Sequence, residues 1–168
     1  MTQERAGTDL DQRLARVRTV PELADVVRTF ARTAADADGA TFVLREGDRC
    51  FYADEDSIAP LWKGQRFPIA TCISGWAMIH DQVVVVPDIT VDERIPLAAY
   101  RPTFVQSLMM VPVGRGAPVA AIGAYWARVH RAGEEEQRRL LAVADAAAAA
   151  LDRIGLGTAP WAPTFADD

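Results

Sequence analysis

The 168-residue sequence predicts a single α+β domain built around one antiparallel sheet. Two pairs of β-type runs are each joined by a short turn that contains glycine, so the strands of each pair must be antiparallel. Amphipathic helical stretches stand at both ends of the pattern, and helical pieces interrupt the β-type runs in the middle. This order predicts terminal helices on one face of the sheet and the middle segment on the other.

The first two helices are expected at residues 9–18 and from Pro21 onward. Proline suits the first position of a helix, and Gly39 is expected to end the second one. Thr90 and Glu93 have the spacing of a capping box, which predicts a short helical piece after the fourth strand. Strands are expected at 41–45, 49–53, 65–69, 83–86, 107–113 and 118–128, and further helices at 73–80 and 134–154.

Three segments follow from this pattern. Residues 1–20 are assigned to an N-terminal helix, and residues 21–154 to the domain itself. Residues 155–168 form a tail rich in glycine, alanine and proline, which we expect to be poorly ordered unless Trp161 docks.

Charge and composition argue against several classes of protein. The formal net charge is −5 and no basic patch stands out, so no nucleic-acid partner is expected. No apolar run is long enough to cross a membrane, and the polar first ten residues do not resemble a signal peptide. The two cysteines, Cys50 and Cys72, form no disulfide framework, so we expect a cytoplasmic location.

Four stretches, in this order, resemble GAF domains: residues 66–69 with 72–77, residues 82–89, residues 107–113, and residues 122–126 leading into the last helix. Residues 94–96, 100–105 and 107–108 resemble the variant found ahead of bacterial sensor histidine kinases. The resemblance implies a six-stranded antiparallel sheet, a pocket between that sheet and the middle segment, and a dimer through the terminal helices.

The resemblance therefore implies a regulatory sensory domain of bacterial signal transduction that binds a small molecule, and not an enzyme. The sequence carries no phosphoacceptor histidine helix and has no room for an ATP-binding domain. If the parent protein is a kinase, the chain is a fragment of it. If the chain is complete, its output passes to a separate partner, such as a histidine kinase.

The expected pocket residues are mostly apolar and aromatic, as in most ligand sites. They are Phe67, Cys72, Ile73, Trp76, Tyr100, Phe104, Ser107, Met109 and Tyr125. A planar or aromatic ligand would suit this set, but the sequence does not name the ligand or a cofactor. Ordinary core packing explains the same aromatic residues, and a collapsed pocket without ligand stays open as an alternative.

Cys72 is the clearest candidate for chemistry. It precedes a predicted helix N-terminus, where the helix dipole lowers the pKa of a thiol. A thiol redox sensor follows as an alternative function, against which stands the simple packing of a small buried residue. The free methionine sulfoxide reductases are GAF-like enzymes that use more than one cysteine around this loop. Here Ser74 stands where a cysteine would be wanted, and Cys50 lies on a separate strand.

Other cofactors find little support. Residues 92–106 lack the cysteine and histidine at which bilin-binding GAF domains attach their chromophore, so no covalent bilin is expected. Thr103, Gln106 and Ser107 could contact a cyclic nucleotide, but polar residues also serve turns and solvent-facing positions. The histidines and cysteines have no metal-ligand spacing, so no metal site is expected.

A seam of small and apolar residues in the last helix indicates a homodimer. Its steps are four, three, four and three, and its alanines permit close helix approach. The expected interface residues are Leu14, Val17, Leu140, Ala144, Ala147, Leu151 and Ile154. A helix that only covers its own sheet produces a similar stripe, and an interaction-only dimerisation domain is the third functional class that the sequence leaves open.

Overall fold

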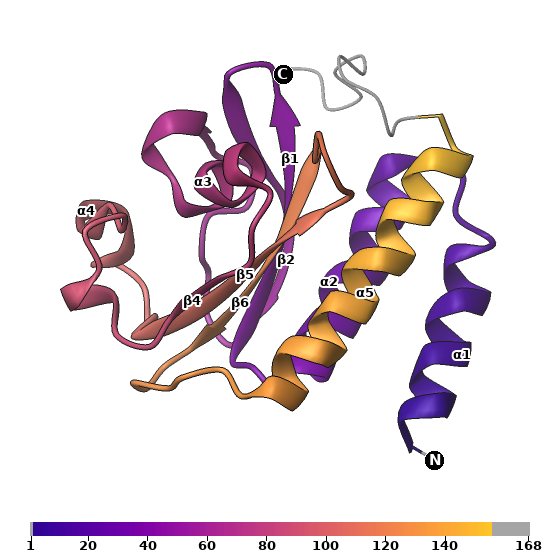
Figure 1. Ribbon diagram of the computed structural model, residues 1–168, viewed down its shortest axis with the longest axis horizontal. Coiled ribbons are helices and arrows are strands. Elements are labelled where there is room, and N and C mark those ends of the chain that lie inside the picture. The colour runs from indigo at the N-terminus through magenta and orange to yellow at the C-terminus, as the bar shows by residue number, and fades with distance from the viewer. Residues whose placement is uncertain (1, 156–168) are drawn as a thin grey trace.

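Three layers make up the computed structural model, which describes residues 2–155 (Figure 1). A sheet lies in the middle, with three helices on one face and the middle segment of the chain on the other. This is the predicted α+β architecture, and it is confirmed. The predicted tail is residues 155–168, and all of it after Gly155 lies outside the described residues. The helices are α1 (Thr2–Leu14), α2 (Val20–Ala35), α3 (Ile73–His80), α4 (Leu97–Tyr100) and α5 (Glu134–Arg153).

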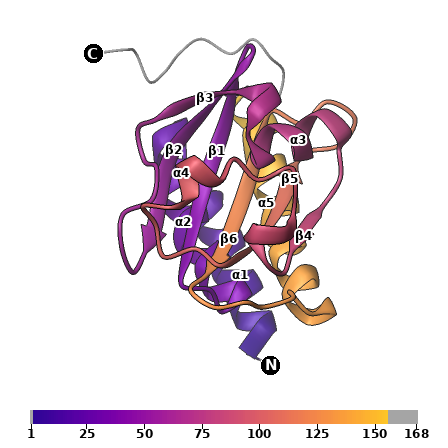
Figure 2. The same cartoon turned by 90° about the vertical axis from the view of Figure 1, so that its left-hand side faces the viewer.

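The sheet contains six antiparallel strands in the order β3-β2-β1-β6-β5-β4 (Figure 2). The first strand pairs with both the second and the last, so the two ends of the domain meet at the sheet centre. The middle segment is the part of the chain between β3 and β5, residues 69–106, and it contains two single turns of 3₁₀ helix, η1 (Ile69–Thr71) and η2 (Ile89–Val91). The strands are β1 (Gly39–Glu46), β2 (Arg49–Ser57), β3 (Arg66–Pro68), β4 (Val84–Val86), β5 (Ser107–Val113) and β6 (Ala120–Trp126).

Each strand of the sheet serves two separate cores because neighbouring residues point to opposite faces. In β5, Met109 and Val111 pack under the terminal helices, whereas Leu108 and Met110 pack under the middle segment. The face under the middle segment carries the candidate site.

The second helix begins as the proline indicates but ends earlier than predicted. Thr19 caps its N-terminus, and Glu22 completes a capping box with it. The helix ends at Asp36, which takes the left-handed conformation with φ 50°. Gly39 begins β1 instead. A Cβ at this position would lie 2.7 Å from Oγ of Ser57 on the neighbouring strand. The predicted stop at Gly39 is therefore wrong; this glycine permits a close approach of two strands.

The helical piece after β4 also differs from the prediction. Its cap is Asp88, whose carboxylate accepts the backbone N–H of Thr90 at 2.9 Å and the Thr90 hydroxyl at 2.6 Å. Thr90 is thus the partner of a cap rather than the cap itself, and only the single turn η2 forms.

The first helix packs onto the rest of the domain. It begins at Thr2 instead of residue 9, and its end is held by Arg153 of α5, which donates to the carbonyl oxygens of Leu14 (2.6 Å) and Val17 (3.0 Å). Within residues 2–155, no helix has both the length and the apolar composition needed to cross a membrane.

Candidate functional site

A small cavity lies between the sheet and the middle segment. Its volume is about 50 Å³, whereas pockets for drug-sized ligands usually measure about 300–1,000 Å³. The cavity therefore fits a molecule of few heavy atoms unless the middle segment moves. Its lining consists of Tyr52, Trp62, Phe67, Thr71, Cys72, Pro96, Ala99 and Tyr100.

Aromatic side chains fill most of the space around this cavity. The ring of Tyr52 meets those of Trp62 and Phe67 edge to face, with centroids 5.5 Å apart in both pairs. Trp62 in turn contacts Tyr100 at 4.8 Å and Tyr125 at 5.4 Å. Edge-to-face pairs of this kind are favourable beyond the area that they bury. Trp62 is thus the ring that joins the sheet side of the site to α4.

Hydrogen bonds hold Trp62 in place from two directions. Its indole N–H donates to the carbonyl oxygen of Ala99 at 2.9 Å. The carboxylate of Glu55, at the end of β2, accepts the backbone N–H groups of Leu61 (2.9 Å), Trp62 (3.0 Å) and Lys63 (3.0 Å). Three bonds to one charged acceptor fix the loop that carries the ring.

The same end of β2 also contacts the second helix on the opposite side of the sheet. Arg28 of α2 donates to the carbonyl oxygen of Glu55 at 2.8 Å and forms an ion pair with Asp54 at 3.2 Å. Arg32 pairs with Asp56 at 2.8 Å. Residues 54–56 therefore connect the loop of Trp62 to α2 through direct contacts.

Two cysteine sulfurs lie side by side at the wall of the cavity. The register of β2 and β3 sets Cys50 opposite Phe67, and the chain then turns through η1 to Cys72 at the start of α3. The two Sγ atoms are 3.1 Å apart. The Ser74 hydroxyl donates to Cys72 Sγ at 3.4 Å and bonds with the Tyr52 hydroxyl at 3.1 Å.

This arrangement gives the two thiols different pKa values. The hydrogen bond from Cys50, together with the Ser74 hydroxyl and the Gly75 N–H, lowers the pKa of Cys72 to about 6 despite burial. The pKa of Cys50 is raised far above its usual value, because its proton is held by Cys72 and because the group is buried. The arrangement therefore favours a thiolate on Cys72 and a protonated thiol on Cys50.

Three of the predicted pocket residues, Phe67, Cys72 and Tyr100, line the cavity. Tyr125 lies beneath Trp62, with its hydroxyl bonded to Thr41 at 2.9 Å. Ile73 and Phe104 belong to the same core but not to the cavity wall.

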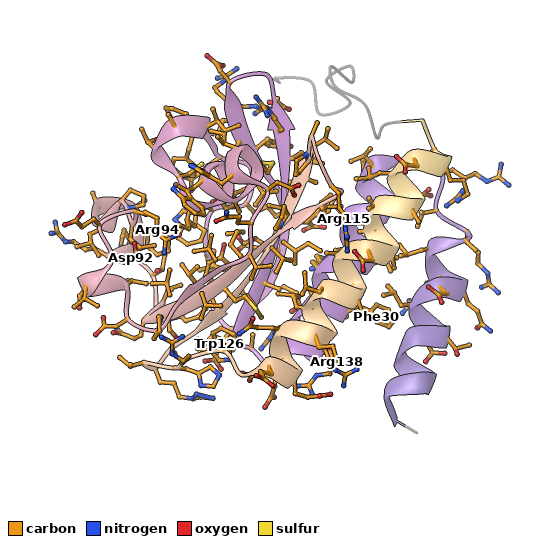
Figure 3. All side chains as sticks on the ribbon, viewed as in Figure 1. Phe30, Asp92, Arg94, Arg115, Trp126 and Arg138 are labelled. Atoms are coloured by element: carbon orange, nitrogen blue, oxygen red, sulfur yellow. The ribbon has the colours of Figure 1, made fainter. Side chains whose placement is uncertain are left out.

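The other three predicted pocket residues lie elsewhere. Met109 points to the core under the terminal helices. The Ser107 hydroxyl donates to the carbonyl oxygen of Arg128 at 2.7 Å. Trp76 is half-buried against the core under the middle segment but does not line the cavity, and its ring stacks on His80 with ring centroids 4.0 Å apart. The guanidinium of Arg94 lies 4.7 Å from the centroid of the Trp76 ring. Arg94 also pairs with Asp92 of the middle segment (Figure 3). The assignment of these three predicted residues to the pocket is corrected.

Five residues that line the cavity were not predicted from the sequence: Tyr52, Trp62, Thr71, Pro96 and Ala99. The alternation of β2 carried a signal for Tyr52, since it shares a face with Cys50. Trp62 had no local signal, because it lies on an irregular loop that is held by hydrogen bonds to Glu55, and no motif in the sequence indicates these bonds.

The predicted dimer seam is buried inside one chain. Six of its residues lie in the core between the sheet and the terminal helices, and Ile154 is half-buried against that core. The stripe on α5 thus covers the chain's own sheet and its own helices. Leu141 and Ala148, which widen the stripe, are only half-buried. The core residues are Leu14, Val17, Leu140, Ala144, Ala147 and Leu151.

The hydroxyls of Thr103 and Ser107, which were considered for a cyclic nucleotide, both form local hydrogen bonds. The Thr103 hydroxyl donates to the carbonyl oxygen of Tyr100 at 2.7 Å, which closes a turn. Over the described part of the chain, no three His, Cys, Asp or Glu side chains come together as metal ligands would.

A six-stranded antiparallel sheet, covered by terminal helices on one face and by the middle segment on the other, is the fold of GAF domains. The chain belongs to the GAF domain family, whose model matches residues 17–152. A search of curated proteins gave no significant match.

Solved structures with the same fold come from several kinds of protein. The GAF domain of a phosphoenolpyruvate-protein phosphotransferase from Acinetobacter is 13% identical, with a TM-score of 0.77 over 91% of this chain and 94% of that one. A free methionine-R-sulfoxide reductase from Neisseria meningitidis, in complex with its substrate, is 18% identical, with a TM-score of 0.72 over 92% and 89%. Residues 122 to 287 of a methyl-accepting chemotaxis protein are 14% identical, with a TM-score of 0.73 over 90% and 99%. At these identities the likeness concerns the fold.

Proposed function

We propose that this GAF domain is a regulatory input module of bacterial signal transduction, in which occupancy of the cavity changes the packing of the terminal helices. The observation that carries the proposal is the connection from Trp62 through Glu55 to Arg28 of α2. The fold is shared with domains of a phosphotransferase and of a chemotaxis protein, which supports a role in signalling.

The size of the cavity indicates how a ligand would act. A molecule that needs more than about 50 Å³ enters only if Trp62 or the turn of α4 moves, because these elements close the space. Displacement of Trp62 strains the three hydrogen bonds to Glu55, and Glu55 is bonded to α2. A ligand shifts the packing of α2 to the extent that it prefers one of the two arrangements.

The proposal includes several finer expectations. The occupant is a small molecule, planar or aromatic if the α4 turn opens, and the domain itself performs no catalysis. It is cytoplasmic and acts as a homodimer, which passes the signal to a histidine kinase or another output partner. Because the original seam is buried, the dimer would use the half-buried Leu141 and Ala148 on α5.

Native mass spectrometry of the purified protein, under gentle and then denaturing conditions, tests the ligand. The expected result is a mass excess that disappears on denaturation and is absent from the variant Ala99→Leu, whose longer side chain fills the cavity. Ala98→Leu is the matched control, since Ala98 is the exposed neighbour of a cavity-lining residue and should leave the excess unchanged.

A different outcome would favour the interaction-only domain. If the wild-type protein carries no excess and gives the mass of a clean dimer, the cavity is empty and the role is dimerisation. If Ala99→Leu and Ala98→Leu both retain an excess, the ligand lies outside this cavity and the proposal fails.

A further inference from the structure

The two cysteine sulfurs face each other in a way that simple packing does not require. A disulfide bond measures about 2.05 Å, and the 3.1 Å between the Sγ atoms of Cys50 and Cys72 leaves an approach of only about 1 Å to form one. The sulfur of Cys50 lies on β2, and the sulfur of Cys72 lies at the junction of η1 and α3. A bond between them would join the sheet directly to the middle segment.

We propose that Cys50 and Cys72 form a dithiol site that a small hydroperoxide, such as hydrogen peroxide, oxidises to an intramolecular disulfide. Cys72 is the attacking residue and Cys50 the resolving residue. The site does not depend on the ligand-binding function proposed above, because it needs only the two sulfurs and access for the oxidant.

The reaction balances in two steps. The Cys72 thiolate attacks one peroxide oxygen, the O–O bond breaks, and a sulfenic acid and hydroxide form; the hydroxide takes up a proton to become water. The Cys50 sulfur then attacks the Cys72 sulfur, the S–O bond breaks, and the thiol proton leaves with the hydroxyl as a second water. The two sulfurs lose two electrons in total, and the peroxide gains them.

Access and size favour a small oxidant. Cys72 lines the cavity and is 7% exposed, whereas Cys50 is fully buried behind it. A space of about 50 Å³ admits a molecule with two oxygen atoms but excludes a bulky one. The first oxidation therefore falls on Cys72, and Cys50 reacts only with its neighbour.

Local hydrogen bonds support the same order of reaction. Cys72 receives donors from Cys50, Ser74 and the Gly75 N–H, which stabilise a thiolate. Other ionisable groups around the pair leave this charge in place: burial raises the pKa of Tyr52, Tyr100 and Tyr125, which keeps them neutral at pH 7. Arg45, on the neighbouring strand, contributes positive charge near Cys50.

Intact-mass and peptide measurements on the reduced full-length protein test the proposal. One equivalent of hydrogen peroxide is expected to lower the mass by about 2 Da per chain, with loss of both thiols and full recovery in dithiothreitol. Trypsin is expected to release residues 50–63 and 67–94 as one cross-linked peptide, since the cleavage sites at Arg49, Lys63, Arg66 and Arg94 separate the cysteines.

Serine variants separate the two roles. Cys50→Ser is expected to stop at the Cys72 sulfenic acid, a gain of about 16 Da that dimedone captures. Cys72→Ser is expected to leave Cys50 reduced at the same peroxide concentration. Far-UV circular dichroism checks that each variant folds, and the wild-type measurement stands by itself if one does not.

Three results would overturn the proposal. The first is a gain of oxygen atoms in the wild type without the cross-linked peptide. The second is a disulfide that joins two chains instead of Cys50 to Cys72. The third is resistance of both thiols to peroxide at concentrations that oxidise the unfolded chain.

Discussion

Replacing Ala147 with glutamate distinguishes a core position from a dimer seam. Ala147 has 0% exposed surface and lies among Leu140, Ala144 and Leu151 in the core beneath α5. A carboxyl group placed there must take up a proton, since an isolated charge is costly in an apolar core. At pH 7, protonating a carboxyl of ordinary pKa about 4.3 costs about 1.36 kcal/mol for each of about 2.7 units, or about 3.7 kcal/mol.

Steric crowding adds to this cost. Enlarging a side chain in a packed core costs about 1–3 kcal/mol, so the total loss is about 5–7 kcal/mol against a stability of about 5–15 kcal/mol for a typical domain. We expect Ala147→Glu to unfold at far lower urea concentration than the wild type, measured by far-UV circular dichroism. Ala149→Glu, on the exposed side of the same helix, is expected to change stability by at most about 0.5 kcal/mol.

The pH dependence gives an internal check. Burial raises the pKa of the new carboxyl in the folded state, so the folded variant binds more protons than the unfolded chain above pH about 4.3. The free energy of unfolding of the variant therefore falls as pH rises, because the carboxyl ionises in the unfolded chain. Lowering the pH from 7 to 5 is expected to restore about 2.7 kcal/mol of this free energy. If Ala147→Glu unfolds like Ala149→Glu but loses a dimer by light scattering, Ala147 lies at an interface and the argument from burial is refuted.

Three further predictions address the site. The alkylation rate of Cys72 with iodoacetamide should rise with pH and reach half its maximum near pH 6, whereas a free thiol does so at about pH 8.5. Ser74→Ala should move this midpoint upward, because it removes one donor to the Cys72 sulfur. A midpoint above pH 8 in the wild type would contradict the proposed role of these donors. Glu55→Gln should speed amide hydrogen exchange at residues 61–63, because the charged acceptor of three bonds is lost; unchanged exchange would mean that Glu55 does not hold the Trp62 loop. Gly75→Ala would place a Cβ 1.8 Å from the Ile69 carbonyl oxygen and should lower the free energy of unfolding by at least about 1–3 kcal/mol in thermal and urea denaturation. Gly7→Ala, with nothing within 4 Å, should stabilise α1 by about 0.5–1 kcal/mol and serves as its control.

Some of the residues that line the cavity could be predicted from short sequence motifs. Phe67, Cys72 and Tyr100 line the cavity, as the family resemblance implied. Met109 was misplaced for a physical reason. Residues 108–111 are all apolar, so the alternation of β5 fixes that neighbours face opposite sides but not which set faces the pocket.

The seam on α5 shows a second limit of sequence patterns. A repeat of 3.5 residues and one of 3.6 residues differ by only about 20° in each heptad, so over one helix they predict the same stripe. Packing against the sheet and α1 then determined what the stripe covers.

The sequence by itself determined the class of fold and the approximate position of most helices and strands, because side-chain periodicity and turn residues act over a few neighbouring positions. Strand β5, expected at residues 107–113, and α3, expected at 73–80, have those bounds in the structure. Tertiary structure alone decided the meeting of Cys50 with Cys72, the clamp of Glu55 on the Trp62 loop, and the volume of the cavity. The sulfur contact and the cavity depend on strand register and on the packing of residues distant in the chain, whereas the Glu55 clamp depends on the path of an irregular loop. No periodicity or turn motif encodes these distances.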